Sequence, residues 1–266
     1  MSLSSIPNGY KGMFPFRLAT TSYIYPDRIV PNVIRLAPYF DEVELVLFES
    51  EGENNLPEEA DICLLGEISL NQQLGFNVHL PIDIFLGDKK DETRYLACSA
   101  IKKVIRRTLP LNPSLYTLHL DLRDMTGQDH ADIEGWKARI TQSLEEIMGE
   151  GIEPNRISIE NLDYPFSWIE DIIERFGLSI CLDIGHILSY GQDLQNFFEK
   201  YLMATSIIHL HGFENGVDHL GIHTIEDTKM ELILSCLRTF QGIVSIEVFS
   251  FDDLYRSLKV FEEKWR

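Results

Sequence analysis

The sequence is short of positive charge. It has 23 lysine and arginine residues against 42 aspartate and glutamate residues, which gives a formal net charge of -19. Proteins that bind nucleic acids usually present a basic face, because they must neutralise many phosphates. We therefore expect no nucleic acid among the partners of this protein. A small phosphorylated substrate is compatible with the charge, because bound metal ions can neutralise a single phosphate locally.

Cysteine pairs and long apolar runs are also lacking. The four cysteines stand far apart in the sequence, at Cys63, Cys98, Cys181 and Cys236, and none forms a C-x-x-C pair. We expect Cys98 and Cys181 to be buried free thiols, since both lie in runs with apolar patterning. No apolar stretch approaches the roughly 18 residues needed to cross a bilayer, and residues 1–13 lack the apolar core of a signal peptide. These absences predict no membrane association and a cytoplasmic location.

The first strand-like run, Phe16–Ser22, is not followed by a glycine-rich phosphate loop but by Tyr-Ile-Tyr-Pro. A dinucleotide-binding Rossmann fold is therefore disfavoured. The chain also lacks a linker, a low-complexity segment or a block of like charges that would divide it. We predict a single domain over residues 1–266.

What the sequence does contain is a regular alternation of short apolar runs with longer helix-patterned segments. The eight predicted strands are Phe16–Ser22, Glu42–Phe48, Phe76–Leu80, Leu115–Asp121, Arg156–Glu160, Leu178–Asp183, Ser206–His211 and Ile243–Phe249. The predicted helices are Asp27–Ala37, Glu58–Leu74, Lys90–Arg107, Asp132–Gly149, Pro165–Phe176, Asp193–Met203, Thr228–Thr239 and Asp252–Trp265. Strands that alternate with helices pair in parallel, and eight such units favour closure. The prediction is an α/β fold, a single (β/α)₈ TIM barrel.

Imidazoles and carboxylates recur at the ends of six consecutive predicted strands. Such groups are costly at the end of a buried strand unless they are paired or bind a metal. A single histidine on a strand is more often a hydrogen-bonded core residue than a metal ligand. Ionisable residues at the equivalent place of six strands favour a shared metal cluster instead. In a barrel these places converge at the face where active sites lie. The residues are His79, His119, Glu160, Asp183 with the nearby His186, His209 and Glu247.

Other polar residues near the strand ends are less informative. We interpret Glu49 and Asp121 as caps or rim residues, and His130 as solvated surface because it lies between acidic residues. The role of His223 is open.

These residues and their spacing resemble the xylose isomerase-like superfamily of barrels, and the metal set is most similar to the apurinic endonuclease (endonuclease IV) branch. The most specific motif is Asp183-x-x-His186, with Glu160 on the preceding strand. The resemblance implies that Glu160 bridges two ions, that His79 and His119 bind one side, and that Asp183, His209 and Glu247 bind the other.

The same resemblance implies a third ion at His186 with Asp218 and His219. The family pattern there is Asp-x-His, whereas this sequence has Asp218-His219, so that either His219 or His211 supplies the nitrogen. We expect one to three divalent ions per chain, zinc or manganese.

The sequence around the first two predicted strands resembles that of the cobamide-remodelling phosphodiesterases. It reads Pro15-Phe16-Arg17-Leu18, then Thr20-Thr21-Ser22-Tyr23, and later Asp41-x-Val-Glu-Leu-Val-Leu-Phe-Glu49. Members of that group hydrolyse the phosphoribosyl bond in the nucleotide loop of a corrinoid. The resemblance implies a small corrinoid, or another phosphodiester, as the substrate.

The predicted reaction is metal-assisted hydrolysis of a phosphodiester, with Glu160, Asp183 and Glu247 as the catalytic carboxylates. Arg123, just beyond the fourth strand, and His211 are predicted to bind the substrate. The alternative is a sugar isomerase or epimerase that uses Glu160 and Glu247 as acid and base around one ion. Two further alternatives are an abasic-site endonuclease, which the net charge disfavours, and a binding barrel without catalysis.

Overall fold

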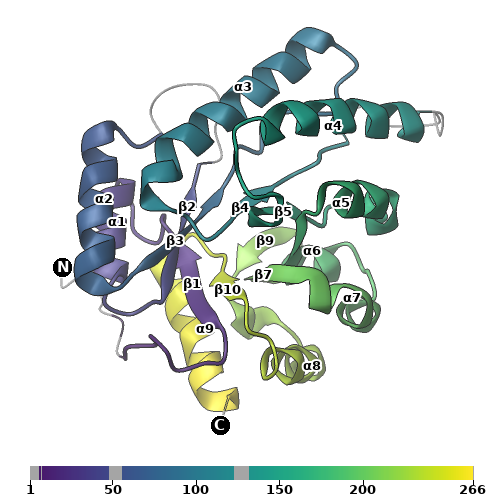
Figure 1. Ribbon diagram of the computed structural model, residues 1–266. Helices are drawn as coiled ribbons and strands as arrows, with labels where there is room; N and C mark the ends of the chain where they lie inside the picture. Colours follow the sequence, from purple (N-terminus) through teal and green to yellow (C-terminus); the bar gives the residue numbers. More distant parts are fainter. Residues whose placement is uncertain (1–5, 7, 48–55, 123–131, 266) are drawn as a thin grey trace.

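The computed structural model describes residues 6, 8–47, 56–122 and 132–265, and within them eight parallel strands close into a barrel in the order β1-β10-β7-β6-β5-β4-β3-β2 (Figure 1). This confirms the predicted (β/α)₈ fold. All eight predicted strands are present at their expected places. The barrel strands are β1 (Arg17–Thr21), β2 (Glu42–Val46), β3 (Gly75–His79), β4 (Tyr116–Leu118), β5 (Ile157–Glu160), β6 (Ser179–Asp183), β7 (Thr205–Leu210) and β10 (Ile243–Ile246).

Helices follow the strands around the outside of the barrel (Figure 1). The α-helices are α1 (Ile29–Leu36), α2 (Glu59–Gln72), α3 (Asp91–Thr108), α4 (Ile133–Met148), α5 (Glu170–Phe176), α6 (Ile184–Ser189), α7 (Leu194–Tyr201), α8 (Asp227–Leu237) and α9 (Phe251–Lys264). Short 3₁₀ turns lie at η1 (Leu109–Leu111), η2 (Pro154–Arg156), η3 (Phe166–Trp168), η4 (Leu202–Ala204) and η5 (Ile222–Thr224). No helix in these described segments is both long and apolar enough to cross a membrane.

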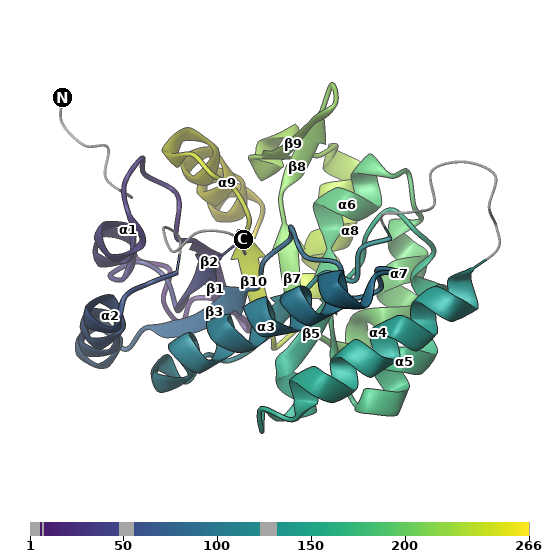
Figure 2. The same cartoon turned by 90° about the horizontal axis from the view of Figure 1, so that it is seen from above.

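Three local features differ from the predicted elements. The predicted helix Pro165–Phe176 is divided into η3 and α5, because Ile169 leaves helical geometry with φ -114° and ψ 1°. The short helix α6 was not predicted; it begins directly where β6 ends. A two-stranded hairpin, β8 (Gly212–Glu214) with β9 (Val217–Leu220), was also missed, and Figure 2 shows it projecting from the end of β7 beside α6.

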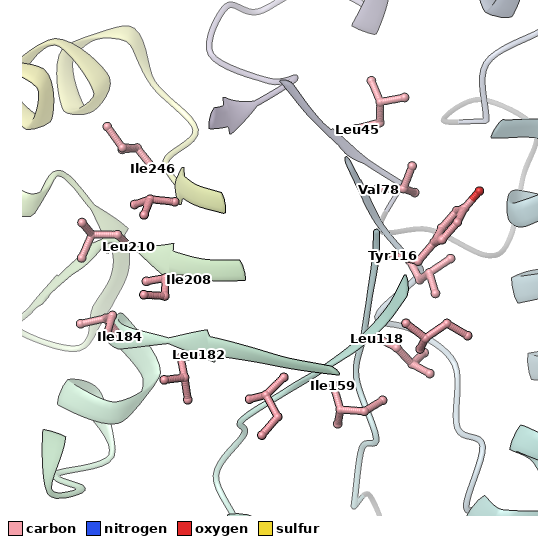
Figure 3. Close-up of a cluster of buried hydrophobic side chains, with 14 of the residues drawn as sticks. Leu45, Val78, Tyr116, Leu118, Ile159, Leu182, Ile184, Ile208, Leu210 and Ile246 are labelled. Atoms are coloured by element: carbon pink, nitrogen blue, oxygen red, sulfur yellow. The ribbon is translucent and has the colours of Figure 1, made fainter. Parts of the chain in front are cut away.

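Side chains alternate between the two faces of each barrel strand. One set is mostly apolar and packs against the helices; Figure 3 shows part of this layer, including Leu45, Val78, Leu182 and Ile208. The other set is apolar only low in the barrel. Ala19, Leu115, Cys181, Ile207 and Ile243 form a separate buried cluster there. Above them the buried set is polar, which places ionisable groups at the carboxyl ends of the strands.

The last helix packs on the outside of the barrel, as predicted. Leu254, Leu258 and Phe261 are among its buried residues, and Phe14 contacts Trp265 edge to face with ring centroids 5.1 Å apart. The helix begins at Ser250, whose hydroxyl accepts a hydrogen bond from the backbone N–H of Asp253 at 3.1 Å, a favourable N-cap.

Candidate metal centre

The predicted site residues come together because parallel strands end at the same face. His79, Glu160 and Asp183 are the last residues of β3, β5 and β6. Asp183 is also paired in register with His209 of β7. His119 and Glu247 lie just beyond β4 and β10. The structure therefore brings the ends of six strands into one buried cluster.

Glu160 lies at the middle of this cluster, with four imidazoles around one carboxylate. Its Oε2 is 3.3 Å from His79 Nε2 and 3.2 Å from His209 Nδ1. Its Oε1 is 3.2 Å from both His119 Nε2 and His186 Nδ1. A carboxylate with ring nitrogens beside both oxygens has the arrangement of a group that bridges two ions.

A second set of donors surrounds His211. Its Nε2 lies 3.1 Å from the Asp183 carboxylate, and its Nδ1 lies 3.2 Å from Asp218 Oδ1. The His219 ring stacks on it at 4.3 Å. His186, His211 and His219 can offer nitrogens that lie within 4.8 Å of one another. Both His211 and His219 therefore face the place expected for a third ion.

The donor set fits divalent metal ions. Within the described residues, His119 Nε2, both ring nitrogens of His209 and Glu247 Oε2 are buried and lack a hydrogen bond of acceptable geometry. Buried polar atoms normally have a partner. Here His209 Nδ1 lies 3.1 Å from Glu247 Oε2, and His119 Nε2 lies 3.2 Å from Glu160 Oε1. Nitrogen and carboxylate oxygen are donors that zinc accepts, and manganese favours oxygen. Buried groups of histidine and glutamate thus indicate a divalent metal site.

The charges of the metal-free cluster are strongly coupled. Burial lowers the pKa of His186, but the carboxylates of Asp183 and Glu160 outweigh it and raise the pKa to about 10. Burial raises the pKa of Glu160, yet His119 and His209 hold it well below its usual range. Hydrogen bonding from His211 likewise outweighs burial and lowers the pKa of Asp218 to about 2. The His186 imidazole thus holds a proton that a metal ion would displace.

Glu44 of β2 is a residue of this site that the sequence did not indicate. It is fully buried, and its Oε1 lies 3.0 Å from His209 Nε2. Ser245 donates a hydrogen bond to the Glu44 Oε2 atom at 2.5 Å. In histidine ligands of metals, the N–H of the second ring nitrogen commonly donates a hydrogen bond to a carboxylate. This bond fixes the orientation of the ring and its tautomer. Glu44 Oε1 and His209 Nε2 lie at ion-pair distance without hydrogen-bond geometry, so Glu44 is a charged neighbour of His209, whose Nδ1 faces Glu160 and Glu247.

Asn161 and Gly185 hold the Asp183-x-x-His186 motif in shape. The Asn161 side chain accepts a hydrogen bond from the Asp183 N–H at 2.7 Å and donates one to the Asp183 carbonyl at 3.1 Å. A Cβ on Gly185 would lie 1.9 Å from the His211 ring. Glycine is needed there so that His211 can reach Asp183. The Asp183 carboxylate in turn accepts a hydrogen bond from the His186 N–H and caps α6.

The remaining predicted residues fall outside the cluster or outside the described residues. Arg123, Glu49 and His130 lie in segments that the structure does not describe. Exposed His223 lies on η5, with its Nε2 3.5 Å from Arg256, so it is no part of the cluster. The four cysteines are free, and Cys98 and Cys181 are buried, as predicted. The Cys181 thiol lies 3.8 Å from Glu160 Oε2.

The sequence matches a family of proteins described as "Xylose isomerase-like TIM barrel" over residues 40–264. The chain belongs to this family. It is an enzyme of the family with a buried candidate metal site, which confirms the coarser part of the predicted resemblance. No curated protein sequence matches the chain.

Solved structures with the same fold are distant in sequence. A D-tagatose 3-epimerase-like protein is 21% identical, with a TM-score of 0.76 over 93% of this chain and 96% of that one. An IOLI protein with a bound zinc atom is 13% identical, with a TM-score of 0.71 over 94% and 98%. Endonuclease IV from Thermus thermophilus is 14% identical, with a TM-score of 0.68 over 93% and 98%. At these identities the likeness establishes the fold.

Proposed function

We propose that this protein is a metal-dependent phosphodiester hydrolase that cleaves the phosphoribosyl bond in the nucleotide loop of a cobamide. One observation carries the hydrolase assignment: the cluster contains two donor triplets that share no residue. His79, His119 and Glu160 form one, and His186, His211 and His219 form the other. A single ion does not need two separate triplets, whereas phosphodiester hydrolysis profits from several ions around one phosphate.

The reaction replaces one bond to phosphorus by another. Water adds to phosphorus, the bond from phosphorus to the ribose oxygen breaks, and the ribose leaves as an alcohol while the phosphate stays on the corrinoid. Divalent ions supply charge neutralisation at the phosphoryl oxygens and acidify water. The protein's own carboxylates orient the reactants. Burial raises the pKa of the Glu247 carboxyl, but His209, whose Nδ1 lies 3.1 Å from Glu247 Oε2, holds it well below its usual range, so Glu247 stays ionised and suits binding a cation.

The corrinoid assignment rests on the resemblance of the first two strands to cobamide-remodelling enzymes. The mouth of the site is consistent with a large substrate that has apolar parts, because tyrosine and phenylalanine side chains follow β1 and β10 there. Tyr23, Tyr25, Phe249 and Phe251 line a shared cleft.

A second candidate is a sugar epimerase. His79, His209 and Glu247 form one possible single-ion group, and Glu160 with Asp183 lies beside it, so that one ion with two carboxylates for proton transfer is also feasible. Several structures that share the fold are described as epimerases, among them D-psicose 3-epimerase and 3-keto-D-glucoside 4-epimerase. These names favour the epimerase, whereas the number of histidines favours the hydrolase.

One assay separates the two. The protein, loaded with zinc or with manganese, is incubated with a cobamide under reducing conditions and, in parallel, with a keto sugar such as D-tagatose. We expect cobinamide phosphate and a riboside from the cobamide, and no change in the sugar. Glu160→Gln should lower cobamide turnover by roughly 10²-fold or more, because one bridging charge is lost while the side chain keeps its size.

Glu199→Gln, an exposed change on α7, is the matched control and should turn over the cobamide normally. Epimerisation of the sugar without cobamide cleavage would replace this proposal by the epimerase.

A further inference from the structure

A cleft of about 630 Å³ opens between the segments that follow β1 and β10. These strands are paired neighbours in the barrel, so both segments emerge at the face that holds the metal cluster. The side chains that matter here are Tyr23, Tyr25, Asp27, Phe249, Ser250 and Phe251. Ile24 and Pro26 complete the lining, so four of the eight lining residues are aromatic.

The wall after β1 is held in place from beneath by Asn32. This side chain is fully buried and accepts a hydrogen bond from the Tyr25 N–H at 2.8 Å. Its amide also donates to the carbonyl oxygens of Tyr25 at 3.1 Å, Asp27 at 3.0 Å and Arg28 at 3.0 Å. A loop with this many contacts to one buried amide is preorganised.

The wall after β10 is equally fixed. Ser250 caps α9, and Thr21 of β1 donates a hydrogen bond to the Val248 carbonyl at 2.6 Å, which joins the two walls. Tyr25 packs against Phe251 across the cleft with ring centroids 5.7 Å apart. Both walls are therefore fixed in place. Tyr25 is itself buried, with Arg35 4.9 Å from its ring centroid, so the rings that face a ligand are those of Tyr23, Phe249 and Phe251.

Phe249 connects the cleft with the metal cluster. Its ring lies 5.2 Å from the ring of His219, and His219 Nε2 lies 3.8 Å from Glu247 Oε2. Phe249 is 38% exposed, so part of it faces the cleft. A substrate whose phosphate meets the cluster can thus extend its next group over Phe249 into the cleft.

We infer that this cleft binds the planar aromatic base of the riboside that leaves when the phosphodiester is cleaved; the inference rests on the proposed function. The described lining has no lysine or arginine, and Asp27 is already paired with Arg35 at 3.1 Å, so the cleft suits an uncharged ring and not a phosphate. Aromatic side chains stack on the flat face of any nucleic-acid base, because every base has such a face. The volume is in the range of sites for single drug-sized ligands, whereas a corrin with its side chains is much larger.

The test uses binding, which does not depend on hydrolysis. A benzimidazole riboside and free ribose are titrated into the purified protein, and saturation-transfer NMR identifies which ligand protons contact it. We expect the riboside to bind through its base protons and ribose not to bind. Phe249→Ala should weaken riboside binding by roughly tenfold, because one stacking face is lost.

Phe249→Leu keeps an apolar side chain without an aromatic face and should also weaken binding, even where the alanine variant folds poorly. Tyr95→Ala removes an exposed tyrosine of α3 and should bind as the unchanged protein does. The inference would be overturned if the unchanged protein, Phe249→Ala and Phe249→Leu bound the riboside with equal affinity. Ribose that binds as tightly as the riboside would also overturn it.

The two proposals fail separately. Hydrolysis of a simple diester such as bis(p-nitrophenyl) phosphate without riboside binding would refute the cleft alone. Phe249-dependent riboside binding without hydrolysis of a cobamide or a simple diester would refute the proposed function alone.

Discussion

At the scale of single residues, the contact between Glu44 and His209 shows how the barrel prepares a ligand. The Glu44 carboxylate is fixed by Ser245 and lies 3.0 Å from His209 Nε2. The negative charge of Glu44 favours a proton on that nitrogen, and His209 Nδ1 faces Glu160 and Glu247. We propose that Glu44 is a positioning residue for the candidate metal centre.

We predict that Glu44→Gln weakens zinc binding by about tenfold to a hundredfold, because the neutral amide holds the imidazole less firmly. Competition with a chromogenic chelator measures the affinity directly. Ser245→Ala should act in the same direction with a smaller effect. Glu199→Gln removes an exposed carboxylate from α7 and should leave zinc affinity unchanged. A Glu44→Gln protein that binds zinc as tightly as the parent protein would refute this role.

The convergence of the strand-end histidines and carboxylates was predictable from the sequence because each interrupts an apolar run at the same place. Glu44 was not, since β2 and β7 are not neighbours in the sheet and the contact crosses the barrel interior. Gly185 could not be assigned either. Its role depends on the His211 ring, which arrives from another strand. Spacing along the chain does not report such contacts.

At the scale of elements, the β8–β9 hairpin carries Asp218 and His219 to the cluster. Its turn is Asn215-Gly216, with φ of 52° and 79°, between the paired residues Glu214 and Val217. An Asn-Gly pair with two positive φ angles is the favoured two-residue hairpin turn. The hairpin was missed in the sequence because its strands are short and lack an alternating apolar pattern.

We predict that Gly216→Val removes one bound ion per chain. Valine is strained by about 1–3 kcal/mol at a positive φ, so the turn and the two ligands after it shift. The barrel core lies elsewhere, and thermal unfolding of the metal-free protein should change little. Asn215→Gly tolerates the same backbone angles and serves as the control. The hypothesis fails if the Gly216→Val protein binds as many ions as the Asn215→Gly protein.

The eight strands were predictable because each is a short run whose helix-facing residues are mostly apolar and buried. The division between η3 and α5 was not, since the interruption at Ile169 is a matter of backbone angles that helix periodicity does not encode. The short helix α6 likewise depends on the cap that the Asp183 side chain forms on the His186 N–H.

At the scale of the whole molecule, the net charge of -19 bears on the choice of substrate. A duplex would have to approach a surface that repels it. We predict no detectable binding to an abasic DNA duplex at moderate salt in a gel-shift assay. Tight binding accompanied by incision would instead favour an abasic-site endonuclease.

The count of metal ions per chain tests the central claim most directly. The two donor triplets without a common residue, His79 with His119 and Glu160, and His186 with His211 and His219, imply room for more than one ion. Elemental analysis of protein purified without a chelator, normalised to protein concentration, gives the count. We predict two or three zinc or manganese ions per chain. A single ion that persists after dialysis against excess metal would contradict a multi-ion hydrolase and favour the epimerase.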